Sequence, residues 1–116
     1  MKRLLLTITV ALLFAQSALA AHKTVNCEIT TGNEVVYKGK CDFIPDQGGT
    51  FSLSNIDQDK PLFEHVMMIT VYITGKGTAQ VRGLTTSANN SLWGDAKRSP
   101  KDKACWVGED FKICAR

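Results

Sequence analysis

Four cysteines constrain what this chain can fold into more strongly than any other feature of its sequence. They are the only cysteines among 116 residues, and they stand at positions 27, 41, 105 and 114. An even number of cysteines in an exported chain indicates a disulfide framework, and four cysteines allow three pairings. The alternative is a zinc site, but such sites usually place cysteines about two to four residues apart, and these gaps are longer. We therefore expect two disulfides, no metal and no other cofactor.

The N-terminal segment, residues 1–20, has the features of a cleavable secretory signal. Two basic residues at positions 2 and 3 precede an uncharged, mostly apolar run over residues 4–14, and Ala18-Leu19-Ala20 ends the segment with small residues. These are the three parts that signal peptidase substrates share. The run is too short for a membrane span, which needs about 20 apolar residues. We predict cleavage after Ala20 and an exported mature domain, residues 21–116, without a membrane span.

The charge of the chain is nearly balanced. It has 14 basic and 11 acidic residues, and its net charge of +3 falls to +1 without Lys2 and Arg3 of the predicted signal. A nearly neutral domain has no general attraction to nucleic acid or to an anionic membrane. We expect neither as a partner.

The mature part alternates apolar and polar residues with a period of two, which predicts an all-β domain. The clearest strand covers residues 65–74, where Ile69, Val71 and Ile73 share one face. Its other face is also partly apolar, which predicts a central strand covered on both sides. Shorter strands are predicted at residues 24–30, 34–38, 41–43, 51–54 and 78–84. The expected fold is a small antiparallel sheet, a flattened barrel or a sandwich of about six to eight strands.

The strand pattern favours a disulfide between each cysteine and its neighbour in the sequence. Cys27 and Cys41 both fall on the apolar faces of their predicted strands, so a bond between them would lie on the packed side of the sheet. A hairpin is predicted over residues 105–114, and a two-residue turn at 109–110 would place Cys105 opposite Cys114 and Trp106 opposite Ile113. Glu-Asp is not a favoured sequence for such a turn, so a longer loop is the alternative. We predict the pairs Cys27–Cys41 and Cys105–Cys114.

Residues 85–103 lack a clear period and are predicted to form a long connection, with a short helical turn near 95–98 as an option. Long ordered loops are often functional. The candidate binding residues therefore lie here: Trp93, Lys97, Arg98 and Lys101. Tryptophan and arginine are enriched among interface hot spots. The alternatives are that Trp93 anchors the connection onto the sheet and that the basic residues are merely solvated.

No catalytic residue is predicted. The sequence has no G-x-S-x-G motif, and the cysteines are expected to be paired. His65 follows Glu64, but adjacent residues on a strand point to opposite faces and cannot form an acid–base pair. We expect a non-enzymatic binding module that recognises a protein or an envelope component, for instance an inhibitor or an immunity protein. A cell-envelope enzyme and a purely structural envelope protein are the alternatives.

The C-terminal part of the chain resembles a group of exported proteins. Trp93-Gly94-Asp95-Ala96-Lys97-Arg98 is followed by Cys105-Trp106-Val107-Gly108 and Phe111-Lys112-Ile113-Cys114. This order resembles small uncharacterised exported proteins of Gram-negative bacteria, in which W-G-x-A-x-R precedes C-W-x-G-x-x-F-x-I-C. The resemblance covers residues 93–114. It implies a periplasmic location and implies no activity.

Overall fold

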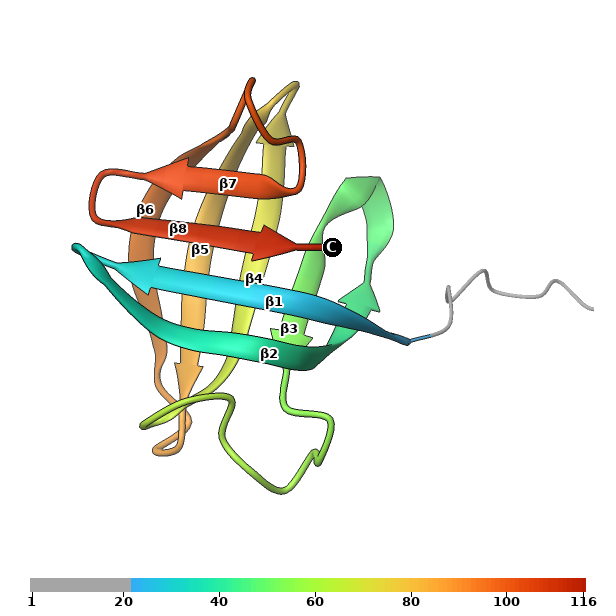
Figure 1. Ribbon diagram of the computed structural model, residues 1–116, viewed down its shortest axis with the longest axis vertical. Helices are drawn as coiled ribbons and strands as arrows, with labels where there is room; N and C mark the ends of the chain where they lie inside the picture. The colour runs from blue at the N-terminus through green and yellow to red at the C-terminus, as the bar shows by residue number, and fades with distance from the viewer. Residues whose placement is uncertain (1–21) are drawn as a thin grey trace, which may run out of the picture.

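In the computed structural model, which describes residues 22–116, the alternating segments pair into a closed antiparallel barrel (Figure 1). The elements in chain order are β1 (Lys23–Thr31), β2 (Glu34–Pro45), the 3₁₀ turn η1 (Gln47–Gly49), β3 (Phe51–Ser54), β4 (Val66–Gly75), β5 (Thr78–Thr85), β6 (Asn90–Arg98), β7 (Cys105–Gly108) and β8 (Phe111–Ala115). Each strand pairs with the next, and β8 pairs with β1. The prediction of an all-β fold is confirmed, and of the arrangements considered the chain adopts the barrel. The predicted signal segment lies outside the described residues.

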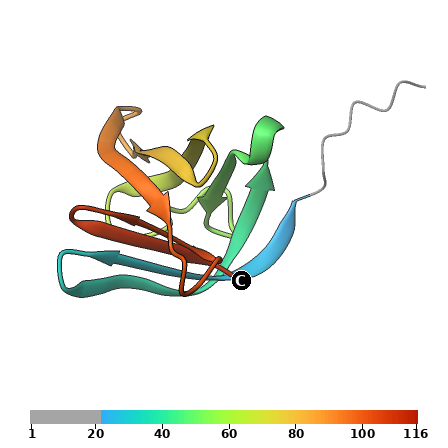
Figure 2. The same cartoon turned by 90° about the horizontal axis from the view of Figure 1, so that it is seen from above.

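The core of the barrel is formed by one face of each strand. In Figure 1 β7, β8 and β1 run across the front of the molecule, with β4, β5 and β6 lengthwise behind them, and Figure 2 shows these two layers from above. Six aliphatic side chains between these layers have no exposed surface: Ile29, Leu53, Ile69, Val71, Val81 and Ile113. On the outer face of β4, Tyr72 is 39% exposed. The prediction of a strand covered on both sides is therefore wrong, because a closed barrel packs only the inner face.

Both predicted disulfides are confirmed, and they lie on different faces of the barrel wall. Cys27 and Cys41 are buried within the core cluster, so their bond joins β1 to β2 inside the barrel. Cys105 and Cys114 are opposite each other on β7 and β8, while Trp106 and Ile113, the next pair, belong to the core. The chain-entropy model gives about 3 kcal/mol for the first disulfide and about 2.7 kcal/mol for the second.

The prediction of a connection without strand structure over residues 85–103 is wrong, as is the option of a helical turn near 95–98. Residues 90–98 of this segment form β6, which pairs with β5 and β7. The alternation is hidden because Trp93 is inserted as a bulge: Gly94 pairs with Val81 and Leu92 with Arg82. A bulge shifts the side-chain period by one residue, so no single alternating pattern runs through the strand.

The part of the chain that the structure describes contains no helix with the length and apolar character needed to cross a membrane.

Candidate functional site

One end of the barrel is plugged by aromatic side chains. The β1–β2, β3–β4, β5–β6 and β7–β8 connections lie at this end. Trp93 packs edge-to-face against Phe63 and Phe111, with ring centroids 6.3 Å and 5.8 Å away. Gly83 leaves room for the indole, because a Cβ there would lie 2.7 Å from the Trp93 Nε1 atom. The rings of Trp93, Phe63 and Phe111 therefore fill the barrel at this end, and Trp93 occupies a position that fits the anchoring alternative.

The other end opens into a cavity of about 520 Å³, which we call the mouth cavity. Its floor is apolar and largely aromatic, formed by Val25, Phe43, Phe51, Ile73 and Trp106. Its basic rim consists of Lys23, Lys76, Arg98, Lys103 and Arg116. Glycines 48, 49, 75 and 77 complete the lining together with Ala104 and Ala115. The volume lies within the range typical of ligand pockets, about 300–1,000 Å³.

The rim carries positive charge with little compensation. Among residues 22–116, the only rim cation in an ion pair is Arg116, which binds Asp102. Lys23 holds its Nζ 5.8 Å from the centroid of the Phe43 ring, and the Arg98 guanidinium carbon lies 5.5 Å from the Trp106 centroid. A cation over an aromatic face keeps its full charge while it is held in place. The mouth cavity thus combines an apolar floor with a basic rim on which, within residues 22–116, only Arg116 is in an ion pair.

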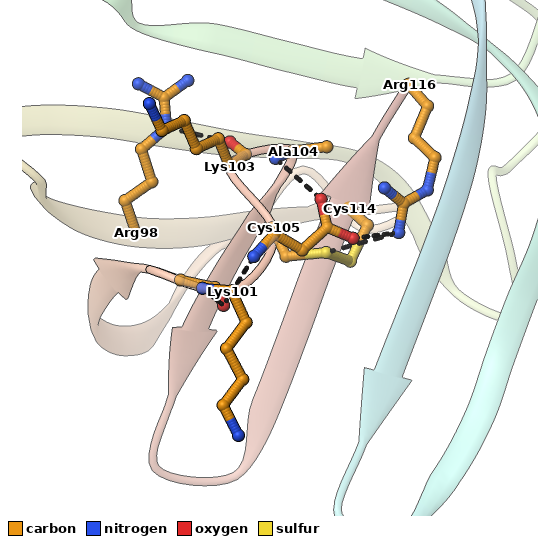
Figure 3. Close-up of a disulfide and its surroundings, with 9 residues drawn as sticks. Arg98, Lys101, Lys103, Ala104, Cys105, Cys114 and Arg116 are labelled. Carbon is orange, nitrogen blue, oxygen red and sulfur yellow. Dashed lines mark hydrogen bonds and ion pairs between the residues drawn. A yellow bond between two sulfur atoms is a disulfide. The ribbon is translucent and has the colours of Figure 1, made fainter.

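Arg98 faces inward because of its register on β6. It pairs with Trp106 on β7, and Ala96, two residues earlier on the same face, is buried in the core. Its Nε donates a hydrogen bond to the carbonyl oxygen of Lys103 over 2.9 Å, which fixes the guanidinium at the rim (Figure 3). The strand end and the following segment therefore place Arg98 and Lys103 side by side.

The segment between β6 and β7, residues 99–104, folds back on itself and is fixed by Asp102. The carboxylate of Asp102 accepts a hydrogen bond from the Ala104 amide over 3.1 Å and pairs with Arg116. The hydrogen bond from Arg116, with a further one from the Ala104 amide, holds the pKa of Asp102 below its ordinary value. The same hydrogen bond, with the charge of Asp102, raises the pKa of Arg116. Arg116 also lies 3.8 Å from the sulfur of Cys105, over the outer disulfide.

The four binding residues predicted from the sequence do not form one site. Arg98 lines the mouth cavity, and Trp93 lies in the aromatic plug. Lys97 points outward and lines a separate groove with Asp95 and Glu109. Lys101 lies beside the outer disulfide and points away from Arg98 (Figure 3).

Most residues of the mouth cavity were not predicted from the sequence. Lys23, Lys76 and Arg116 stand far apart in the chain, and none belongs to a motif. The signal that could have found them is positional. Each stands at or next to a strand end, and in a meander barrel every second connection meets at the same end of the molecule.

Comparisons with protein-family models, with curated proteins and with solved structures gave no match to this chain. Within residues 22–116, no three His, Cys, Asp or Glu side chains gather in a way that could hold a metal ion.

Proposed function

We propose that this chain is a small exported binding module that recognises a protein or an envelope component through the mouth cavity. The observation that carries the proposal is the pairing of an aromatic floor with a basic rim at the one end of the barrel that the plug leaves open. An apolar centre inside a polar rim is the usual anatomy of a protein interface. An inhibitor or an immunity protein would use its surface in this way.

The lining supports binding over acid–base or nucleophilic catalysis. Among the described residues, those that line the mouth cavity include no imidazole, carboxyl, hydroxyl or thiol side chain. A catalytic site for group transfer needs a base and a nucleophile that converge on one point. The lysines and arginines of the rim supply charge and hydrogen-bond donors instead.

Export is part of the proposal. It rests on the predicted signal of residues 1–20, on the resemblance over residues 93–114, and on the state of the cysteines. All four are bonded, which suits an oxidising compartment such as the periplasm.

The experiment uses the full chain, expressed in a Gram-negative host with an affinity tag inserted in the exposed turn at 86–89. This turn lies at the plugged end, so the tag leaves the mouth cavity free. The protein recovered from the periplasm should have the intact mass of residues 21–116 plus the tag. An uncleaved chain in the membrane fraction would contradict export.

The recovered protein then serves as bait in periplasmic extract. A mouth double variant, Lys23→Gln with Lys103→Gln, is compared with a surface double variant, Lys38→Gln with Lys60→Gln. Lys38 is exposed on β2, and Lys60 is exposed in the β3–β4 loop, so both variants lose two positive charges. We expect a captured component that the mouth variant loses and the surface variant keeps. The proposal would be refuted if the mouth double variant captured the same components as the wild type, or if the wild type captured nothing. Either result would favour a structural role.

A further inference from the structure

The barrel below the mouth cavity is filled, so the occupant must be short and blunt. The Cys27–Cys41 disulfide and the aliphatic side chains of Ile29, Leu53 and Ile69 are buried in the core. Interiors packed in this way have no space for a long hydrocarbon chain. The apolar floor can therefore cover a single projecting side chain, but it cannot enclose an acyl tail.

The rim cations do not come from one segment of the chain, although Arg98 and Lys103 lie side by side. They come from five places: the start of β1, the β4–β5 turn, the end of β6, the segment of residues 99–104, and the C-terminus. A single compact anion such as phosphate is usually held by converging donors, often an arginine fork. Separate cations around an apolar centre complement several carboxylates placed around one apolar side chain. Charge complementarity of this kind also steers association and rejects basic partners.

Resting on the proposed function, we propose that the partner presented to the mouth cavity is an acidic protein segment. A projecting apolar or aromatic side chain of that segment packs on Phe43 and Ile73, which are only partly buried. Flanking aspartates or glutamates pair with Lys23, Arg98 and Lys103. The guanidinium of Arg98 keeps its Nη atoms for a carboxylate, because its hydrogen bond to the Lys103 carbonyl is made by Nε.

The test uses three capped peptides as probes, with binding followed through amide chemical shifts of the protein. The first is Asp-Glu-Phe-Glu-Asp, the second is its amide counterpart Asn-Gln-Phe-Gln-Asn, and the third is Asp-Glu-Ala-Glu-Asp. We expect the first peptide to shift resonances around the mouth cavity with a Kd near 1 mM, roughly tenfold tighter than either control. The mouth double variant should weaken this binding, and the surface double variant should not.

Three results would overturn the acidic-segment proposal. They are equal binding of the acidic and amide peptides, shifts centred away from the mouth cavity, and no shifts at peptide concentrations up to about 10 mM. Vesicles of phosphatidylglycerol supply the remaining comparison, with phosphatidylcholine vesicles as the control. Mouth-dependent binding to the anionic vesicles without peptide binding would assign the cavity to a lipid headgroup instead.

The capture experiment separates this failure from failure of the proposed function. If the mouth double variant loses a captured component but the acidic peptide does not bind, the mouth remains a recognition site and only the acidic character of its partner is refuted. If the mouth double variant captures the same components as the wild type, the proposed function itself fails, whether or not the peptides bind.

Discussion

Trp93 and Arg98 lie on the same strand, but they act at different ends of the barrel. The indole of Trp93 fills the plugged end against Phe63 and Phe111, whereas Arg98 stands over Trp106 at the rim of the mouth cavity. Trp93 lies in the middle of β6 and Arg98 at its end, and the bulge at Trp93 allows both side chains to face inward. One side chain is therefore expected to matter for stability and the other for recognition.

Separate substitutions should divide these roles. Trp93→Ala is expected to lower the free energy of unfolding by about 3 kcal/mol, because truncation of a partly buried tryptophan that packs against the core leaves a cavity. Arg98→Ala should change it by no more than about 1 kcal/mol, the value of an exposed cation–aromatic contact. Urea unfolding of both variants measures the difference, with Leu92→Ala as the control, since that neighbouring side chain is 56% exposed. A Trp93→Ala protein as stable as the Leu92→Ala control would contradict the plug.

Among the elements, β6 is the strand that the sequence pattern did not predict. The strands β1, β4, β5 and the β7–β8 hairpin could be predicted because they alternate through their central residues, and the register shifts of β1 and β4 lie near the strand ends. The hairpin register followed from the spacing of Cys105 and Cys114. In β6 the inward positions hold Gly94 and Ala96, which look like loop residues, and the bulged Trp93 breaks the period. Small inward residues pack against larger side chains from other strands, so the sequence of β6 alone does not show that these positions face the core.

The mouth cavity could be predicted only in part, for a related reason. Arg98 was identified from a local basic stretch, but its inward direction depends on pairing with Trp106 across the β6–β7 connection. Lys23 and Arg116 are brought to the same rim by the β1–β8 pairing that closes the barrel. The pairing of β1 with β8 brings the two ends of the described chain together, and no local sequence pattern predicts this pairing.

The segment of residues 99–104 should respond to acid through Asp102. Because the folded-state pKa of this carboxyl is depressed, its contribution to stability is present above its ordinary pKa and is lost as the pH falls through the folded value. Asp102→Asn should therefore lower the melting temperature at neutral pH, and the gap to the wild type should close below about pH 4. Melting curves between neutral pH and strongly acidic pH test this. Asp95→Asn, at an exposed carboxylate on β6 with no ion pair in the described residues, should show no such closure, and a constant gap for Asp102→Asn would contradict the assignment.

At the scale of the whole molecule, a nearly balanced chain becomes electrically polar along its barrel. The mouth end carries the five rim cations, and its connections also carry the carboxylates of Asp46 and Asp102. The connections at the plugged end carry five carboxylates, at Asp57, Asp59, Glu64, Glu109 and Asp110, and a sixth, Glu34, begins β2 at the same end. Net charge alone hides this separation, since opposite ends cancel in the sum. A molecule of this kind approaches a charged surface in one orientation.

This polarity predicts that the protein binds a sulfonated cation-exchange resin through its mouth. The mouth double variant and the surface double variant have the same net charge, because each loses two lysine charges. A protein that responded to net charge would elute in both forms at the same salt concentration. We expect the mouth variant to elute earlier, because Lys23 and Lys103 face the resin in the preferred orientation, whereas Lys60 stands among the carboxylates of the plugged end and is already paired with Asp57 at 3.7 Å. At an ionic strength near 0.1 M, interactions between exposed charges more than about 10 Å apart are largely screened. The difference in elution between the two variants should therefore be largest at low salt. Coincident elution of the two variants, or earlier elution of the surface variant, would show that the protein does not bind the resin through the basic rim of the mouth.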